Sequence, residues 1–490
     1  MEFQISKSSF QRGRQCLKRL YLSRNHPELK KSPGLIVQSL YDQGKEVGEI
    51  ARELFPGGQN LESSESLETQ ILTTANALKS DQSIFYEAAF EKDGLFVATD
   101  ILRKNEDAWE IYEVKSTSTI KESLLWDLAF QYHVLKKSGF KKLKIHAVHI
   151  NTSYRLKGSL IPEELFKIKD VTKQVRRFHA EVEKLIQLEK NTLENSEIPE
   201  IAIGAHCTKP HDCEFMDYCW KSVPEDSVLK LTHSSGQHWD LYHDGVKHMK
   251  DIPADFPLSK TQSIQVKAWK SAKEIINQNA LKQFLESLTY PIIHLDFESF
   301  GTAIPIYQHT KPFQQIPFQY SIHIQNGPGQ SPEHLEFLAE GGSDQRQNLL
   351  FKLLRDTEGE GTILAYNQSF EKKIFSDLAV LFPMQQAEIN QRISRIKDLI
   401  DPFRKFWYYT AKMNGSASIK KVLPAMAAEF NYESQAISNG AAASHAYLQL
   451  VKGDFQGDVE QLRRELLDYC TLDTLGMVQI LNKLIEIAER

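Results

Sequence analysis

The feature that most constrains the fold of this chain is a short apolar run at residues 291–300 (PIIHLDFESF), which ends by presenting two acidic residues. Its length and composition predict a buried strand. Side chains alternate between the faces of a strand, so Asp296 and Glu298 share one face. Leu295 and Phe297 then point to the other face. Such a pair of acids either holds a divalent cation or forms an ordinary solvated face, and the rest of the chain must decide between these interpretations.

The chain has 490 residues, which exceeds what one hydrophobic core usually serves and predicts two or three domains. Apolar residues make up 41% and charged residues 25%, values typical of a soluble enzyme. No apolar run approaches the length needed to cross a bilayer, and the first ten residues do not resemble a signal peptide. We therefore expect a cytoplasmic protein with no membrane partner.

The net charge of −5 argues against a protein that coats nucleic acid by bulk positive charge. Basic residues are nevertheless concentrated locally, with eight Lys and Arg residues in 1–31 and a second cluster from Lys136 to Lys144. Basic stripes on an acidic protein suit an enzyme that grips phosphates along one groove. For any single lysine, a solvated helix face is the alternative interpretation.

Five cysteines are too few for a disulfide scaffold, but four of them are placed unusually. Cys207, Cys213 and Cys219 follow one another with five residues between each pair, and Cys16 lies near the N-terminus. Without a signal peptide, this clustering favours a metal or iron–sulfur site over disulfides. Four cysteines would also satisfy tetrahedral Zn²⁺, but zinc ligands are usually paired at closer spacing, so we favour iron–sulfur.

The pattern of residues 1–222 predicts strands that form a meander, followed by a helix and a further strand. We expect helices at 38–54, 66–80 and 121–137, and strands at 83–90, 95–102, 109–116 and 144–150. Asp100 then ends one strand, while Glu113 and Lys115 lie two residues apart on its hairpin partner. Two carboxylates for a metal ion and an ammonium beside its bound water are the groups that phosphodiester hydrolysis needs.

Asp100, Glu113 and Lys115 in this spacing, followed by a helix that carries Gln131, resemble the PD-(D/E)XK nucleases of the RecB-like group. The bracketing cysteines further resemble the iron–sulfur nucleases of CRISPR adaptation and of some helicase–nucleases. The resemblance implies a restriction-endonuclease-like domain at 1–222, with Mg²⁺ or Mn²⁺ on the two acids, Lys115 and Gln131 as catalytic residues, and a [4Fe–4S] cluster on Cys16, Cys207, Cys213 and Cys219.

Many members of that group carry a histidine in the early helix, and residues 44–48 contain none. Glu46 or Glu87 are candidates for the missing ligand. The pattern of residues 223–285, which follow this domain, predicts a small helical connector. We favour a spacer role for it over contact with the backbone of a nucleic-acid duplex.

Three short motifs in residues 286–490 share the order found in the DnaQ-like DEDD exonucleases, which have a ribonuclease H-like fold. They are the D-x-E pair on the strand at 291–300, Glu371 at a strand-to-helix junction that begins at Asn367, and Tyr469 four residues before Asp473 on a long helix. The resemblance implies two metals held by Asp296, Glu298, Glu371 and Asp473, with Tyr469 positioning the attacking water. These motifs also resemble those of a bacterial domain of unknown function that is commonly fused behind RecB-like nucleases, and the whole chain resembles that two-part family.

Several neighbouring residues have competing interpretations. Glu371 departs from the aspartate usual in related exonucleases, which moves the carboxylate by about 1.5 Å. Asp398 is a candidate auxiliary acid, and Asp401 is expected to cap the next helix. Cys470 is expected to be a small buried residue, and the run 407–409 (WYY) either stacks bases or packs in the core.

These expectations describe an α/β protein that acts on nucleic acid as a fusion of two metal-dependent nucleases. DNA is favoured over RNA because of the RecB resemblance alone. Phage defence and DNA repair are the expected settings. The alternative is a binding or scaffolding protein whose nuclease sites have become inactive.

Overall fold

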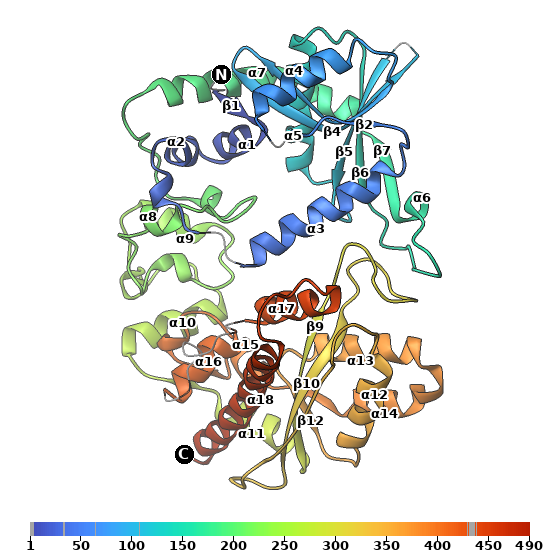
Figure 1. Ribbon diagram of the computed structural model, residues 1–490. Coiled ribbons are helices and arrows are strands. Elements are labelled where there is room, and N and C mark those ends of the chain that lie inside the picture. The colour runs from blue at the N-terminus through green and yellow to red at the C-terminus, as the bar shows by residue number, and fades with distance from the viewer. Residues whose placement is uncertain are drawn as a thin grey trace. The chain divides into compact units, whose positions relative to one another are not determined.

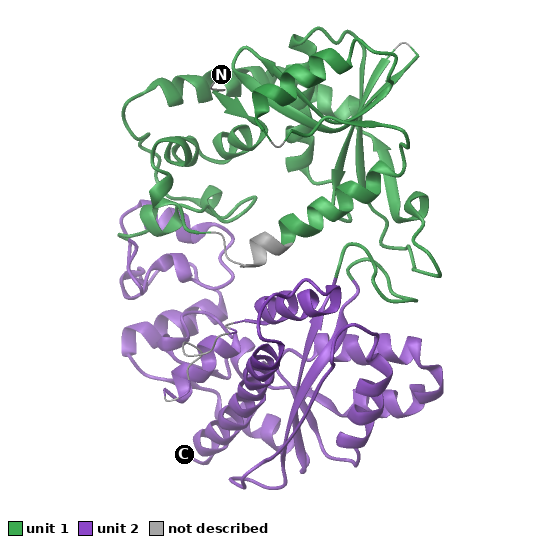
Figure 2. Cartoon of the chain, in the orientation of Figure 1, with its two compact units in different colours: residues 1–222, 302–313 green, residues 223–301, 314–490 purple. Residues whose placement is uncertain are grey.

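The computed structural model has a mixed α/β architecture (Figure 1). It describes residues 4–32, 35–63, 65–106, 108–428, 430, 437 and 439–490, with the backbone alone for 35–39. The chain forms two compact units (Figure 2): unit 1 comprises residues 1–222 and 302–313, and unit 2 comprises residues 223–301 and 314–490. Across the described residues, no helix combines the length and apolar character that a membrane crossing requires.

Unit 1 is built on a mixed sheet that has seven strands within the described ranges, in the order β2-β3-β4-β5-β6-β7 with β1 paired to β4. The strands are β1 (Ile5–Ser6), β2 (Gln59–Asn60), β3 (Ile84–Lys92), β4 (Leu95–Asn105), β5 (Ala108–Lys115), β6 (Leu143–Ile150) and β7 (Phe166–Asp170). β3, β4 and β5 form an antiparallel meander, and β5 pairs in parallel with β6. The predicted meander, its following helix and the next strand are confirmed.

Helices cover both faces of this sheet. They are α1 (Lys7–Gln15), α2 (Leu17–Asn25), α3 (Leu35–Arg52), α4 (Leu67–Ala77), α5 (Glu122–Lys137), α6 (Pro162–Leu165), α7 (Thr172–Glu194) and α8 (Met216–Cys219), with short 3-10 turns at Pro27–Leu29 and Ala205–Cys207. One core joins Phe10 of α1, Phe130 of α5 and Val182 of α7 to the sheet. A second core joins Val47 of α3 to the opposite face and includes Ile304. α5 is buried over most of its length, so its polar side chains Asp127, Gln131 and His133 lie in the interior.

The segment 302–313 belongs to unit 1 although its flanking strands belong to unit 2. Backbone hydrogen bonds join it to the loop after β6, from Leu156 N–H to the Thr310 carbonyl at 3.0 Å and from His309 N–H to the Leu156 carbonyl at 2.8 Å. No periodic pattern in the sequence identified this segment.

Unit 2 contains a mixed five-stranded sheet within the described residues, in the order β11-β10-β9-β12-β13, and a separate pair β14-β8. The strands are β8 (Ile275–Ile276), β9 (Ile292–Phe300), β10 (Ile316–Gln325), β11 (Glu333–Leu338), β12 (Ile363–Ala365), β13 (Ile396–Asp398) and β14 (Tyr408–Tyr409). The central strand β9 is the predicted strand at 291–300, antiparallel to β10 and parallel to β12. At Gly361 a Cβ atom would lie 1.8 Å from the Pro291 carbonyl oxygen, so only glycine permits this approach just before β12.

Helices α12 to α14 pack on one face of this sheet and α18 covers the other (Figure 1). The helices of unit 2 are α9 (Gln237–His243), α10 (Lys260–Ser271), α11 (Gln278–Glu286), α12 (Arg346–Asp356), α13 (Ser369–Leu381), α14 (Gln386–Arg395), α15 (Asp401–Arg404), α16 (Ile419–Met426), α17 (Gly440–Lys452) and α18 (Val459–Glu489), with short 3-10 turns at Val228–Lys230, Met249–Asp251, Pro383–Gln385 and Ala411–Met413. Leu295 and Phe297 face the α12–α14 core, as predicted, and the Phe297 ring lies 5.6 Å from that of Phe375.

Two smaller expectations are resolved by this packing. Tyr408 and Tyr409 are each 1% exposed and belong to the core, which excludes base stacking by these two side chains in this structure. Asp401 is the first residue of α15 and not its cap, so the capping expectation was wrong. Its carboxylate instead accepts hydrogen bonds from Arg404 at 2.6 Å and Lys405 at 2.8 Å.

Candidate active sites

Three carboxylates of unit 2 converge although they lie far apart in the chain. Asp296 and Glu298 lie on β9, and Asp473 lies on α18, which packs against this strand. One carboxylate oxygen of each residue lies within 4.8 Å of the other two. Glu298 and Asp473 are 7% and 8% exposed, so little water remains to solvate their charges. These three predicted ligands therefore form one compact group.

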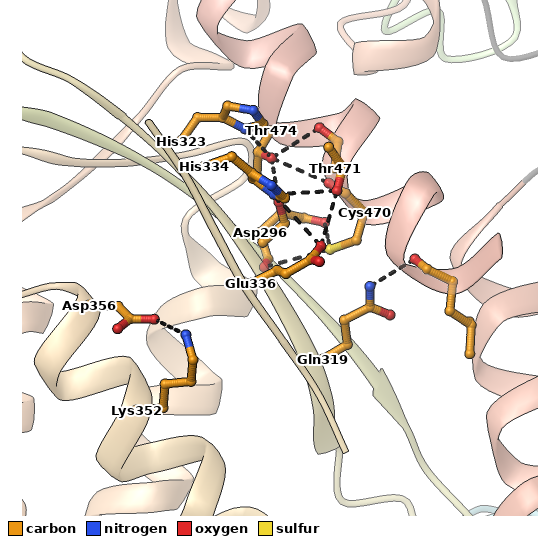
Figure 3. Close-up of polar contacts among 12 residues, drawn as sticks. Asp296, Gln319, His323, His334, Glu336, Lys352, Asp356, Cys470, Thr471 and Thr474 are labelled. Carbon is orange, nitrogen blue, oxygen red and sulfur yellow. Dashed lines mark hydrogen bonds and ion pairs between the residues drawn. The ribbon is translucent and has the colours of Figure 1, made fainter. Parts of the chain in front are cut away.

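Burial and mutual repulsion raise the pKa values of two acids of this group. Burial, followed by repulsion from Asp473, raises the pKa of Asp296 well above its ordinary value. The pKa of Glu298 is raised by burial and then by Asp296 and Asp473. Cys470 Sγ lies 3.7 Å from Oδ2 of Asp296 (Figure 3), so this buried residue touches the group directly. A divalent cation with oxygen ligands would offset the repulsion that burial intensifies.

Tyr469 lies one helical turn before Asp473 and is 4% exposed. Its pKa is raised by burial and then by the charges of Asp473, Glu298 and Asp296, so its hydroxyl stays protonated and can donate a hydrogen bond. Lys420 of α16 lies with Nζ 5.4 Å from the centre of the Tyr469 ring, and its charge lowers the pKa of Glu298. Lys420 was not predictable from the sequence, because no local motif connects α16 to the other residues.

Glu371, the predicted fourth ligand, does not join the group of three. It lies on α13, is 1% exposed, and its Oε2 has no hydrogen-bond partner among the described residues. Burial and then the charge of Asp296 raise its pKa, so the two carboxylates influence each other. Asp398, the last residue of β13, contacts the turn just before this helix. Its carboxylate accepts a hydrogen bond at 2.8 Å from the backbone N–H of Asn367, whose φ is 77°. Asp398 thereby fixes the turn that begins α13.

Side-chain hydrogen bonds attach α18 to β10 and so fix the position of Tyr469 and Asp473 (Figure 3). The Thr474 hydroxyl lies 2.7 Å from the Ser321 hydroxyl and 2.8 Å from Nδ1 of His323. About two turns earlier on α18, the backbone carbonyl of Leu466 accepts a hydrogen bond at 2.8 Å from the Gln319 side chain. These contacts are buried, which makes them sensitive to the loss of either partner.

Unit 1 brings the predicted residues of the first site together around Glu113, which is fully buried on β5. Its Oε1 accepts hydrogen bonds from Lys115 at 2.5 Å and from Lys7 at 2.8 Å, and its Oε2 accepts one from Gln131 at 2.7 Å. Burial alone would raise the pKa of Glu113, but the charges of Lys115 and Lys7 lower it. Lys7, at the start of α1, was not predicted, because its only sequence signal is membership of the N-terminal basic cluster.

Two further acids complete this site. Asp100 accepts a hydrogen bond at 2.7 Å from the Val114 backbone N–H, and burial and then Glu113 raise its pKa. Asp127 on α5 is 7% exposed, with Oδ2 3.8 Å from Lys7 and 3.9 Å from Lys115. Burial raises the pKa of Asp127 to about 7. Asp127 was not among the predicted residues, although its position one helical turn before the predicted glutamine of α5 is a signal in the sequence.

A pocket of about 440 Å³ opens beside Asp100 and Lys115. Glu87 lines it and Glu46 does not, so Glu87 is the better placed of the two candidates for an extra ligand. Glu87 has a φ of 56°, a conformation that is unfavourable for residues other than glycine and that recurs at functional sites. Its carboxylate lies 2.9 Å from Arg52, and burial followed by the charge of Asp100 raises its pKa to about 7.

The four clustered cysteines line a single pocket, and none forms a disulfide. Cys207 is buried, and its carbonyl accepts a hydrogen bond at 2.8 Å from the Cys213 N–H. Burial raises the pKa of Cys213 to about 11 and raises those of Cys16 and Cys219. Four thiols around one pocket form a donor set that both Zn²⁺ and iron–sulfur clusters accept.

Comparison with known proteins adds a family match for part of unit 2. A model of a domain of unknown function, DUF2779, matches residues 293–418, which contain Asp296, Glu298 and Glu371. No solved structure matches the chain.

Three curated relatives from mycoplasmas and a ureaplasma are similar to the chain. Uncharacterized protein MG366 of Mycoplasma genitalium is 25% identical over 299 residues, which are 54% of this chain and 41% of the relative. Its homolog in Mycoplasma pneumoniae is 25% identical over 286 residues, 53% of this chain and 41% of the relative. Uncharacterized protein UU173 of Ureaplasma parvum is 26% identical over 222 residues, 40% of this chain and 32% of the relative. The chain therefore spans about two-fifths or less of the length of these relatives.

Proposed function

We propose that this protein is a metal-dependent nuclease that hydrolyses phosphodiester bonds, with a candidate active site in each unit. The observation that carries the proposal is the convergence of Asp296, Glu298 and Asp473, because three carboxylates within 4.8 Å of one another, two of them buried, are stable together only when protons or cations offset their charges. Oxygen-only ligands are those that Mg²⁺ and Mn²⁺ prefer.

Each residue of the second site has a role in this proposal. A divalent cation bound by Asp296, Glu298 and Asp473 would polarise the phosphate and lower the pKa of a bound water. Tyr469, which stays protonated, would orient the attacking water by donating a hydrogen bond. Glu371 would serve as a fourth ligand after rotation of its side chain, since its Oε2 has no other partner in the described structure.

The sheet of unit 2 supports a ribonuclease H-like DEDD exonuclease as the finer description of this unit. Its central strand β9 carries the D-x-E pair, three strands are antiparallel, and β12 and β13 run parallel to β9 on one side. Glu371 at the start of α13 and Asp473 on the long α18 follow in the order that the DEDD resemblance implies.

The first site supports a PD-(D/E)XK nuclease in unit 1. Asp100 and Glu113 would hold Mg²⁺ or Mn²⁺, Lys115 would stabilise developing negative charge, and Gln131 would hold Glu113 in place. Lys7 and Asp127 extend this set: Lys7 is a second cation on Glu113, and Asp127 is a buried acid beside both ammonium groups.

An iron–sulfur cluster is the proposed occupant of the cysteine pocket. The donor set suits it, because Cys16 and the three cysteines at 207, 213 and 219 line one pocket, and their spacing along the chain differs from the closely paired ligands of zinc sites. The group would connect α2, which begins directly after Cys16, to the segment 207–219, and it would stabilise the fold without taking part in hydrolysis.

DNA is the proposed substrate, with RNA as the alternative, and the preference rests on the RecB resemblance. Defence against phage and DNA repair are the proposed settings. We also propose that the protein acts in the cytoplasm.

One observation favours a second candidate function, a nucleic-acid-binding or scaffolding protein with an inactive first site. Both oxygens of Glu113 already accept hydrogen bonds from Lys7, Lys115 and Gln131, so a metal ion would compete with three donors. A single-site nuclease would result if unit 2 alone were active.

Product mapping on labelled single-stranded and duplex DNA tests the proposal. Lys115→Ala removes a cation of the first site, and Asp296→Ala removes a ligand of the second, so each variant should keep one product pattern. DEDD chemistry resembles 3′-to-5′ trimming to mononucleotides, whereas RecB-like sites also cut internally. If Lys115→Ala alone abolishes all cleavage, the second site is inactive and the roles of Asp296, Glu371 and Asp473 are wrong.

A further inference from the structure

Three potential metal ligands outside both candidate active sites meet where α5 packs against α7 in unit 1. His133 lies on α5, and His179 and Glu183 lie one turn apart on α7. One ligand atom of each residue lies within 4.8 Å of the other two. Nδ1 of His133 lies 3.8 Å from a carboxylate oxygen of Glu183.

The buried histidine has a nitrogen that nothing in the described structure satisfies. His133 is 3% exposed, and its Nδ1 has no hydrogen-bond partner among the described residues. Buried polar atoms are rarely left unpaired, and an unpaired one calls for a partner such as an ion. Burial and then the neighbouring His179 lower the pKa of His133 to about 4, so its ring is neutral at pH 7, the form that binds metals.

We propose that His133, His179 and Glu183 bind one transition-metal ion, for which Zn²⁺ is the best match. Two imidazoles and one carboxylate suit zinc, whereas Mg²⁺ and Ca²⁺ require oxygen ligands. Glu183 has a side chain 53% exposed, so the site opens to solvent on one side and an ion can enter. Lys137, one turn after His133, lies 3.8 Å from Asp93, which partly offsets its positive charge near the site.

The position on α5 gives this ion a structural role. His133 lies two residues after Gln131, and residues two apart on a helix point in nearly opposite directions. The ion would therefore join the face of α5 that carries His133 to α7, while the other face presents Gln131 to Glu113 and Asp127 to Lys115.

The test measures the number of zinc ions bound per chain of the full protein. The protein is purified anaerobically with its cysteine site loaded, and it is then dialysed against Zn²⁺ in excess Mg²⁺. The double variant His179→Ala/Glu183→Gln changes exposed or half-buried residues and should bind one zinc fewer than the wild type. His146→Gln is the matched control: it is a half-buried histidine on β6 with an unpaired Nε2, outside this group, and its zinc count should equal that of the wild type.

X-ray absorption at the zinc edge identifies the ligands independently of nuclease activity. The difference between wild type and double variant should be zinc with nitrogen ligands at about 2.0–2.1 Å, and not sulfur at about 2.3 Å. The proposal is overturned if the two proteins bind equal zinc, or if the zinc that is lost was bound by sulfur. Since neither readout uses DNA, failure here leaves the nuclease proposal standing, and the reverse also holds.

Discussion

The burial of Glu189 in unit 1 predicts that the free energy of unfolding depends measurably on pH. Glu189 lies on α7, is 0% exposed, and neither carboxylate oxygen has a hydrogen-bond partner among the described residues. Its carboxyl faces Gly13 of α1, where a Cβ atom would lie 2.3 Å from Oε1. Burial raises the pKa of Glu189 from 4.5 to about 9, so the folded protein holds a proton that the unfolded chain releases.

The sign and size of the pH effect follow from the difference between the pKa values of Glu189 in the folded and unfolded states. Between pH 4.5 and about 9 the folded state binds one more proton than the unfolded state, so the free energy of unfolding falls as pH rises. One proton corresponds to about 1.4 kcal/mol per pH unit. Unit 1 should therefore lose about 2.5 kcal/mol of stability between pH 6 and pH 8 through this group alone.

Glu189→Gln keeps the shape of the side chain and removes the ionisation, so it should abolish this part of the slope. Unfolding in urea is measured at pH 6 and pH 8 by pulsed hydrogen exchange, read only from peptides of α5 and α7 so that unit 1 is followed separately. Glu181→Gln, an exposed substitution on the same helix, is the control and should retain the slope of the wild type. If the free energy of unfolding changes equally with pH in Glu189→Gln and in the wild type, Glu189 does not cause this pH dependence.

Three further predictions concern the cysteine pocket, the attachment of α18 and the entry to β12. Cys213→Ser should remove the brown colour and visible absorption expected of an iron–sulfur protein, and a colourless wild type that contains stoichiometric zinc after anaerobic purification would contradict this. Thr474→Val removes a buried hydroxyl with two partners on β10 and should lower the free energy of unfolding of unit 2 by about 1–3 kcal/mol in urea denaturation; no loss would show that these contacts do not anchor α18. Gly361→Ala forces a Cβ atom against the Pro291 carbonyl and should abolish soluble expression, whereas Gly44→Ala on α3, where a Cβ meets nothing within 4 Å, should not.

Local patterns predicted most of the elements that carry the sites. The strand at 291–300 was recognisable because its apolar residues and its two acids follow one period, and β9 spans Ile292–Phe300. The helix expected at 121–137 is α5, Glu122–Lys137, and the first-site acids and Lys115 were found because strand and hairpin spacing restricts which residues can meet.

Residues that reach a site from remote elements could not be predicted in this way. Lys7 binds Glu113 across 106 positions of the chain, and Lys420 reaches the Tyr469 ring from α16, so neither belongs to a local motif. Glu371 was predicted from a motif at a strand-to-helix junction, and such a motif does not fix the direction of the side chain, which lies outside the three-carboxylate group.

The most direct test of the proposed nuclease activity compares metal-dependent cleavage by the wild type and by the double variant Lys115→Ala/Asp296→Asn. Labelled single-stranded and duplex DNA are incubated with each protein in Mg²⁺, in Mn²⁺ and in EDTA, and binding is measured in parallel. We expect that the wild type cleaves only with a divalent metal and that the double variant is inert but still binds DNA. Binding by the wild type without cleavage in either metal, or cleavage that persists in the double variant, would contradict it.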